Sequence, residues 1–179
     1  KSYVENNTIL LSDLRYLKMI HYNYSHEIQV GEMIVNKDVC DDVLSVFKEL
    51  LSAEYEIESM YLIDNYWMGD GASSDDESIR NNNTSAFCYR VISRGQKLSN
   101  HAYGRAIDVN PKQNPYIWYD SGGKKHWSAE DADKYIDRTS GSEHMILKGD
   151  ICQTTFEKYG FNWGGNWSNP VDYQHFERK

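Results

Sequence analysis

The chain has 179 residues, 40% of them hydrophobic and 26% charged, with a formal net charge of −8 at pH 7. A chain of this length is most simply one domain that buries a core of its own. The acidic balance argues against a nucleic-acid-binding protein, which needs basic surface to neutralise phosphates. No apolar run reaches the roughly 18 residues of a membrane-spanning helix, so the sequence also predicts no membrane span.

Cysteine is rare in the chain. Its three cysteines, Cys40, Cys88 and Cys152, form no C-x-x-C pair. This excludes thiolate zinc fingers and thioredoxin-like redox sites. One disulfide with a spare thiol and three free thiols both remain open.

The first predicted elements are a strand and a helix. Residues 28–35 (IQVGEMIV) alternate loosely between apolar and polar positions and predict a strand or one limb of a hairpin. Asp38 follows as the expected N-cap of a helix. Five apolar residues then recur at the spacing that lines up one helix face, namely Val39, Val43, Val46, Phe47 and Leu50. Residues 57–63 (IESMYLI) next predict a strand that enters the core.

The middle of the chain is rich in polar and turn-forming residues. Residues 69–83 (GDGASSDDESIRNNN) predict a long surface loop that borders a site. Residues 84–91 (TSAFCYRV) resume a strand-like pattern. Ser128 with Asp131 resembles a capping box that opens a short helix.

A last helix is expected to begin at Asp150, with Phe156 and Tyr159 facing inward and Gly160 as its C-terminal stop. Strands and short helices alternate without the regular βα rhythm of a parallel sheet. The predicted fold class is therefore α+β, with a small, mainly antiparallel sheet flanked by helices.

Residues 98–111 (LSNHAYGRAIDVNP) carry the first candidate site residues. Residues 105–109 predict a strand in which Asp108 faces away from the apolar residues on either side of it. Gly104 permits a sharp turn just before that strand. Such a turn brings the imidazole of His101 alongside the Asp108 carboxylate.

The C-terminal stretch WGGNWSNPVDYQHFERK supplies His175 and, three residues before it, Asp172. In an extended strand these two side chains point to opposite faces, so they converge only if the chain bends before His175; the irregular backbone expected around Pro170 allows such a bend. Two imidazoles and a carboxylate form a three-ligand zinc set with the fourth position left to water, and a second carboxylate beside that water acts as general base. His101, Asp108 and His175 are thus the candidate ligands, and Asp172 is the candidate base.

Spacing alone leaves other interpretations open. His101 could be a turn histidine bonded to the backbone, and His175 a surface residue near the end of the chain. Asp108 could be a strand-end carboxylate paired with Arg105 or Lys112. The chain has six histidines and no H-E-x-x-H helix that would sharpen the choice.

Two motifs, in the right order, resemble a known family. SNHAYGRAID and the later WGGxWx(4)DxxHF resemble the zinc D-alanyl-D-alanine carboxypeptidases and L,D-type endopeptidases of bacterial cell walls. These are the VanY-like peptidases, a group that includes phage endolysins and shares its fold with the hedgehog signalling domain. GEMIVN and NNTSAFCYR also resemble the family's framework, so the resemblance covers roughly residues 28–178. It implies a hedgehog/DD-peptidase-like fold with the metal on the open face of the sheet.

The family pattern, matched residue by residue, implies one zinc ion on His101, Asp108 and His175. It gives Asp172 the position of the acidic general base three residues before the last ligand. The dipeptidase branch of the family uses Glu there, one methylene longer. Asp at this position therefore favours the carboxypeptidase and endopeptidase branches, and it leaves room for an inactive member.

Further residues take family positions. Arg90 matches the arginine that stabilises the oxyanion of the tetrahedral intermediate, with a salt bridge on a strand as the alternative. Ser99 matches the serine that contacts substrate, although it could equally be a plain turn former. Arg94 and Lys97 are candidates for the cation with which a carboxypeptidase grips a terminal carboxylate, with a solvated loop as the alternative. The aromatic residues Phe161, Trp163 and Trp167 are expected in the core and the pocket wall.

The resemblance implies a zinc metallopeptidase that hydrolyses peptidoglycan stem peptides, first of all as a D-alanyl-D-alanine carboxypeptidase. An endopeptidase of the L-Ala-D-Glu type is the alternative within the family. A binding module with structural zinc, or an α+β domain without metal, are the alternatives from other classes. We expect a single domain over residues 1–179, with residues 1–27 as an N-terminal extension packed on it, and a monomer. Stem peptides lie outside the membrane, so the function implies an extracytoplasmic location, although no leader is visible in this chain.

Overall fold

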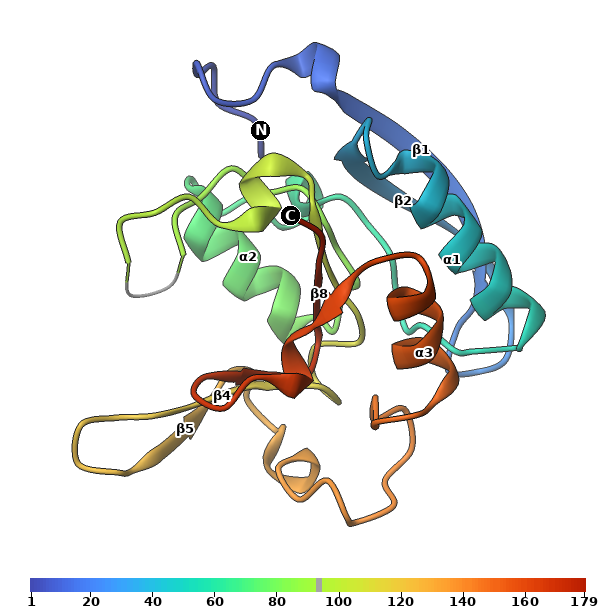
Figure 1. Ribbon diagram of the computed structural model, residues 1–179, viewed down its shortest axis with the longest axis vertical. Coiled ribbons are helices and arrows are strands. Elements are labelled where there is room, and N and C mark those ends of the chain that lie inside the picture. The colour runs from blue at the N-terminus through green and yellow to red at the C-terminus, as the bar shows by residue number, and fades with distance from the viewer. Residues whose placement is uncertain (93–94) are drawn as a thin grey trace.

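The structure, a computed structural model, describes residues 1–92 and 95–179. Three α-helices and eight strands lie in these two segments, and the strands form three small antiparallel sheets (Figure 1). The predicted α+β class with antiparallel pairing is therefore confirmed. The strands are divided among three sheets and do not form one.

A long hairpin forms the first sheet. β1 (Leu14–Tyr22) pairs in antiparallel fashion with β2 (Ile28–Asn36), which confirms the strand expected at residues 28–35. Burial alternates along both strands, so one face of the hairpin is turned to the core. Leu17, Met19, Met33 and Val35 belong to that face and to the main core cluster.

Helix α1 (Cys40–Ser52) packs on this hairpin, and α3 (Ile151–Lys158) lies beside α1 (Figure 1). The four buried apolar residues of α1 are Val43, Val46, Phe47 and Leu50, as the spacing predicts. Phe47 meets Phe156 of α3 edge to face, with ring centroids 6.1 Å apart. Burying each such side chain contributes about 1.5–3 kcal/mol, which fixes the two helices against one another.

The observed helix ends agree only in part with those predicted from the sequence. The N-cap of α1 is Val39 and not Asp38, and no side chain caps it. At α3 the prediction is right, since Asp150 accepts a hydrogen bond from the Gln153 amide and Gly160 ends the helix at a φ of 82°.

Residues 57–63 and 84–91 were expected as strands but form only isolated bridges. Asparagine side chains take the place of a partner strand. The Asn83 amide accepts from the Tyr61 N–H at 2.7 Å and donates to the Tyr61 carbonyl at 2.9 Å. Asn110 likewise accepts from the Glu58 N–H at 3.1 Å. Because these side chains satisfy the backbone groups, Ile57, Met60 and Ile63 are buried without a strand ladder.

Residues 69–83 were expected as a loop, but they contain helix α2 (Gly71–Arg80). Asp70 caps it by accepting a hydrogen bond from the Ser73 amide at 2.9 Å. The capping box expected at Ser128 is also wrong, because a short 3₁₀ turn starts only at Asp133, without a side-chain cap.

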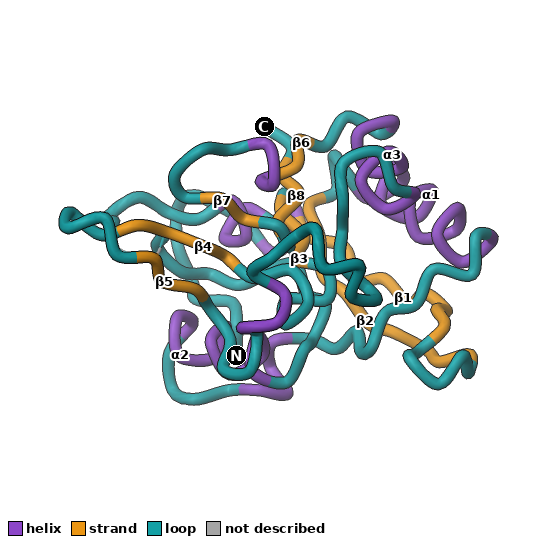
Figure 2. Tube along the Cα trace, turned by 90° about the horizontal axis from the view of Figure 1, so that it is seen from below, coloured by secondary structure: helices purple, strands orange, loops and turns teal. Residues whose placement is uncertain are grey.

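Two short sheets carry the C-terminal half of the chain (Figure 2). In the first, β8 (His175–Glu177) lies between β3 (Ala106–Asp108) and β6 (Asn162–Trp163). In the second, β4 (Tyr116–Tyr119) lies between β5 (Lys125–Trp127) and β7 (Val171–Asp172). The chain therefore changes sheet between Asp172 and His175, which is the bend that the sequence requires before His175.

The N-terminal residues and the cysteines complete the fold. β1 lies within residues 1–27 and contributes Leu17 and Met19 to the core, so this segment packs on the rest of the chain. The single domain over the whole chain stays a prediction. Cys40, Cys88 and Cys152 are all free thiols. Within the described segments, no helix has the length and apolar character needed to cross a membrane.

Candidate metal centre

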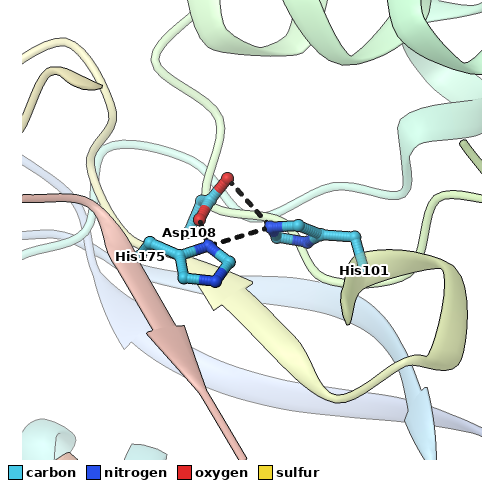
Figure 3. A group of neighbouring side chains, drawn as sticks. All are labelled: His101, Asp108 and His175. Carbon is cyan, nitrogen blue, oxygen red and sulfur yellow. Dashed lines mark hydrogen bonds and ion pairs between the residues drawn. The ribbon is translucent and has the colours of Figure 1, made fainter. Parts of the chain in front are cut away.

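Three side chains from distant parts of the chain converge on one point (Figure 3). The ligand atoms of His101, Asp108 and His175 all lie within 4.8 Å of one another, and all three residues are buried. His101 Nε2 lies 3.2 Å from Asp108 Oδ2 and 3.2 Å from His175 Nδ1. His175 Nδ1 lies 2.9 Å from Asp108 Oδ1. The three predicted ligands are thus brought together.

Local structure explains the convergence. Asp108 on β3 and His175 on β8 are direct cross-strand partners, so their side chains share a face. His101 lies in the 3₁₀ turn Asn100–Tyr103, which ends at Gly104 with a φ of 66°. A Cβ on Gly104 would lie 2.6 Å from the Asn36 nitrogen. Only glycine allows this close, left-handed turn, and the turn returns the chain towards β3.

Hydrogen bonds behind the ligands orient each of them. His101 Nδ1 lies 2.6 Å from the Ala86 carbonyl oxygen, so it donates there and leaves Nε2 free to bind a metal. His175 Nε2 lies 3.3 Å from Glu177 Oε2. Gln174 Nε2 donates to Asp108 Oδ2 at 3.2 Å.

The donor set fits a zinc ion. Two imidazole nitrogens with outward hydrogen bonds on their far sides face one carboxylate, and three such N and O ligands are typical of catalytic zinc. Burial alone would raise the pKa of the Asp108 carboxyl, but the charge and hydrogen bond of His101, together with those of His175, hold it well below its usual range. Asp108 is therefore a carboxylate, as a metal ligand must be.

Asp172 lies at the end of β7 and is 8% exposed. Among the described residues, none gives its buried Oδ1 a hydrogen bond. Burial raises the pKa of Asp172 to about 8, against the attraction of His175 and Arg90. A carboxyl group that exchanges its proton near neutral pH has the property that a general base needs.

Arg90 and Ser99 also line the cavity that contains the candidate ligands. Arg90 Nη2 forms an ion pair with Asp75 Oδ2 of α2 at 2.7 Å, and both side chains are almost fully buried. The salt bridge expected as an alternative for Arg90 is thus present, and the residue lines the same cavity as the ligands. Ser99 is 5% exposed and accepts a hydrogen bond from the His101 amide at 3.3 Å, so it does form the turn.

The cavity around the cluster has a volume of about 730 Å³. Helix α2 supplies one wall, with Asp75, Asp76 and Ile79, and the β4–β5 hairpin supplies another, with Trp118 and Trp127. Trp167 lies against His175 with ring centroids 5.4 Å apart and belongs to the pocket wall. Phe161 and Trp163 are core residues, as expected. Lys97 is exposed, and Arg94 lies outside the described residues.

Sequence reasoning missed four residues of this site. They are Asp75, Asn100, Gln174 and Glu177. A signal existed for Glu177, because residues two apart on a strand share a face and Glu177 follows His175 by two. No comparable signal marks Asp75, which reaches Arg90 only through the tertiary fold.

A buried cluster of two histidines and an aspartate that could hold one metal ion thus shares its cavity with a second aspartate, on an α+β scaffold. Residues 93–178 match the sequence model of the D-alanyl-D-alanine carboxypeptidase family. This match confirms the resemblance to VanY-like peptidases, and the matched segment holds all three candidate ligands. Searches among curated proteins and among solved structures gave no match.

Proposed function

We propose that the protein is a zinc-dependent peptidase that hydrolyses peptidoglycan stem peptides as a D-alanyl-D-alanine carboxypeptidase. The convergence of His101, Asp108 and His175 in one buried cluster carries the proposal. The family match over residues 93–178 supports the reaction class. Asp172 and Arg90 line the same cavity, which supports catalysis over a purely structural metal site, because such a site has no use for a base.

The mechanism assigns a role to each side chain. His101 Nε2, His175 Nδ1 and the Asp108 carboxylate would hold the zinc ion, which supplies Lewis-acid activation of water and of the scissile carbonyl. Asp172 accepts a proton from the attacking water at its carboxylate and then gives that proton to the leaving amine. Arg90 stabilises negative charge on the carbonyl oxygen, and the Asp75 carboxylate holds its guanidinium in place.

Metal analysis together with digestion of defined muropeptides tests this proposal. We expect about one zinc per chain and the loss of a single alanine from a pentapeptide stem, followed by mass spectrometry. Asp172→Ala should keep its zinc and lose turnover by roughly a hundredfold or more. Near-normal turnover in that variant would contradict the assignment of the base, and a protein without zinc would contradict the whole proposal.

An endopeptidase that cuts within the stem is the second candidate, and one observation favours it. The cavity of about 730 Å³ lies within the range that encloses ligands much larger than a dipeptide end. Release of a fragment longer than one alanine in the same digestion would select this candidate.

We further propose that the protein acts as a monomer outside the cytoplasm, where stem peptides are found. A binding module with structural zinc remains the alternative from another class. Zinc content without hydrolysis of any wall fragment would favour that alternative.

A further inference from the structure

Glu177 contacts the candidate zinc site from behind, at the ring nitrogen of His175 that faces away from the ligand cluster. We infer that Glu177 is a positioning residue that selects the tautomer of His175 in which Nδ1 can bind a metal. The inference rests on the zinc site of the proposed function.

His175 lies between two carboxylates. Its Nδ1 is 2.9 Å from Asp108 Oδ1, and its Nε2 is 3.3 Å from Glu177 Oε2. A neutral imidazole carries one N–H, which donates to one of these two carboxylates. If Nδ1 carries the proton, it donates to Asp108 and has no lone pair for a metal. If Nε2 carries it, Nδ1 becomes a free donor atom that faces Asp108 and His101. Only the second tautomer is competent to bind zinc.

His101 does not have this choice. Its Nδ1 lies 2.6 Å from the Ala86 carbonyl oxygen, which can only accept a hydrogen bond. The proton is therefore fixed on Nδ1, and Nε2 is the donor to the metal. Because the acceptor is a backbone atom, no side-chain substitution removes it. The tautomer of His175 depends on a side chain, whereas that of His101 depends on the main chain.

Asn100 holds Glu177 in position. Its Nδ2 donates to Glu177 Oε2 at 2.5 Å, the same oxygen that faces His175 Nε2. Asn100 is also the neighbour of His101 in the 3₁₀ turn Asn100–Tyr103. The Glu177 side chain is 13% exposed and its backbone is paired in β8 with Ala106, so both ends of the side chain are fixed. The contact thereby links the two segments that supply the histidine ligands.

The charge of Glu177 adds to its geometry. A carboxylate that accepts a hydrogen bond from a ligating imidazole makes that imidazole a stronger donor to the metal, and removal of such a partner typically costs ~10–100-fold in metal affinity. A glutamine at this position still accepts from Nε2 through its amide oxygen, but without the charge. Comparison of Glu, Gln and Ala at position 177 therefore separates the contribution of the hydrogen-bond acceptor to zinc affinity from that of its negative charge.

The test measures zinc affinity and tautomer, neither of which needs hydrolysis. Zinc affinity is measured by competition with a chromophoric chelator at pH 7.5 or so, and the nitrogen of His175 that keeps its proton is identified from ¹⁵N chemical shifts of the zinc-loaded protein. Glu177→Ala should lose ~10–100-fold in zinc affinity, with Glu177→Gln between this variant and the wild type. Glu130→Ala is the matched control, because it removes a carboxylate from the same cavity that contacts none of the ligands in the described structure; its zinc affinity should be unchanged.

Two results would overturn the inference: zinc affinity of Glu177→Ala within a factor of about two of the control, or a His175 proton on Nδ1 in the zinc-loaded wild type. If Glu177→Ala fails to fold, Asn100→Ala decides, since it keeps the carboxylate but frees it, and its zinc affinity should then fall below that of the wild type. If zinc binding depends on Glu177 but the wild-type protein cleaves no stem peptide, the proposed function is refuted and this inference stands. If the wild-type protein is active but Glu177→Ala binds zinc equally well, this inference is refuted and the proposed function stands.

Discussion

Arg90 and Asp75 form an ion pair of 2.7 Å whose side chains are only 11% and 8% exposed. The pair joins helix α2 to the cavity that holds the candidate metal ligands. It means that the placement of the Arg90 charge depends on a carboxylate from a helix that precedes the family-matched segment.

Asp75→Asn is expected to destabilise the protein by ~3 kcal/mol, because removal of one partner leaves the Arg90 charge buried and unpaired. Urea unfolding measures the change. Glu77→Ala is the matched control on the same helix, since it breaks the exposed Arg80–Glu77 pair and should cost no more than ~0.5 kcal/mol. If both variants lose the same free energy of unfolding, the buried Arg90–Asp75 pair stabilises the protein no more than the exposed Arg80–Glu77 pair does.

The pH dependence of kcat/KM should have an acidic limb set by Asp172. Burial raises the pKa of this carboxyl to about 8, and a base works only when it is unprotonated, so activity falls as the pH drops through that pKa. A bound zinc cation lowers the value, which places the limb below about 8 but above the ordinary Asp value of about 4.

Zinc content has to be followed over the same pH range, because protonation of the histidine ligands also removes activity by releasing the metal. If activity falls only near the ordinary pKa of an aspartate, and zinc is retained over the whole pH range, Asp172 is not the base.

The Asp172 carboxyl should also lower the folding stability of the zinc-free protein as the pH rises. Its pKa is raised on folding, so the folded state holds the proton more tightly than the unfolded chain, and stability falls as the pH rises from about 4 to about 8. Asp172→Asn removes this dependence. The melting temperature of the variant, measured with chelator present, should exceed that of the wild type by a margin that grows between pH 5 and pH 8.5 or so. A margin independent of pH would contradict this account.

Gly164 lies against the backbone that joins the base to the last ligand. A Cβ at this position would be 2.6 Å from the Asp172 carbonyl oxygen and 3.3 Å from His175 Cβ. Gly164→Ala should therefore displace β7 and β8 and lower both zinc affinity and turnover by ~10-fold or more. Gly122→Ala is the control, because its Cβ would meet only the Asp120 side chain at 3.4 Å. A Gly164→Ala variant with normal zinc affinity would show that the turn yields without moving His175.

Those parts of the site that depend on short-range pattern could be predicted from the sequence. The turn at Gly104 and the strand at Asp108 are local, and the bend before His175 follows from the requirement that Asp172 and His175 share one site. The C-terminal helix was also predictable, because Asp150 and Gly160 mark both of its ends.

Helix α2 could not be predicted in the same way. Its buried residues are Ser74, Asp75 and Ser78, so the face it turns inward is polar and leaves no apolar period in the sequence. Residues 57–63 were wrongly predicted to form a strand for the opposite reason, because they do carry an apolar pattern. Ile57, Met60 and Ile63 are buried, but asparagine side chains satisfy the neighbouring backbone, which no strand pattern can reveal.

The change of sheet between Asp172 and His175 has a mechanical consequence. Asp172 is attached through β7 to the β4–β5 hairpin, whereas Asp108 and His175 are held together by β3 and β8. The candidate base and the candidate ligands are therefore backed by two different hydrogen-bonded sheets. Substitutions in the β4–β5 hairpin would act on Asp172 through the β4–β7 pairing, without a direct pairing to the strands that carry Asp108 and His175.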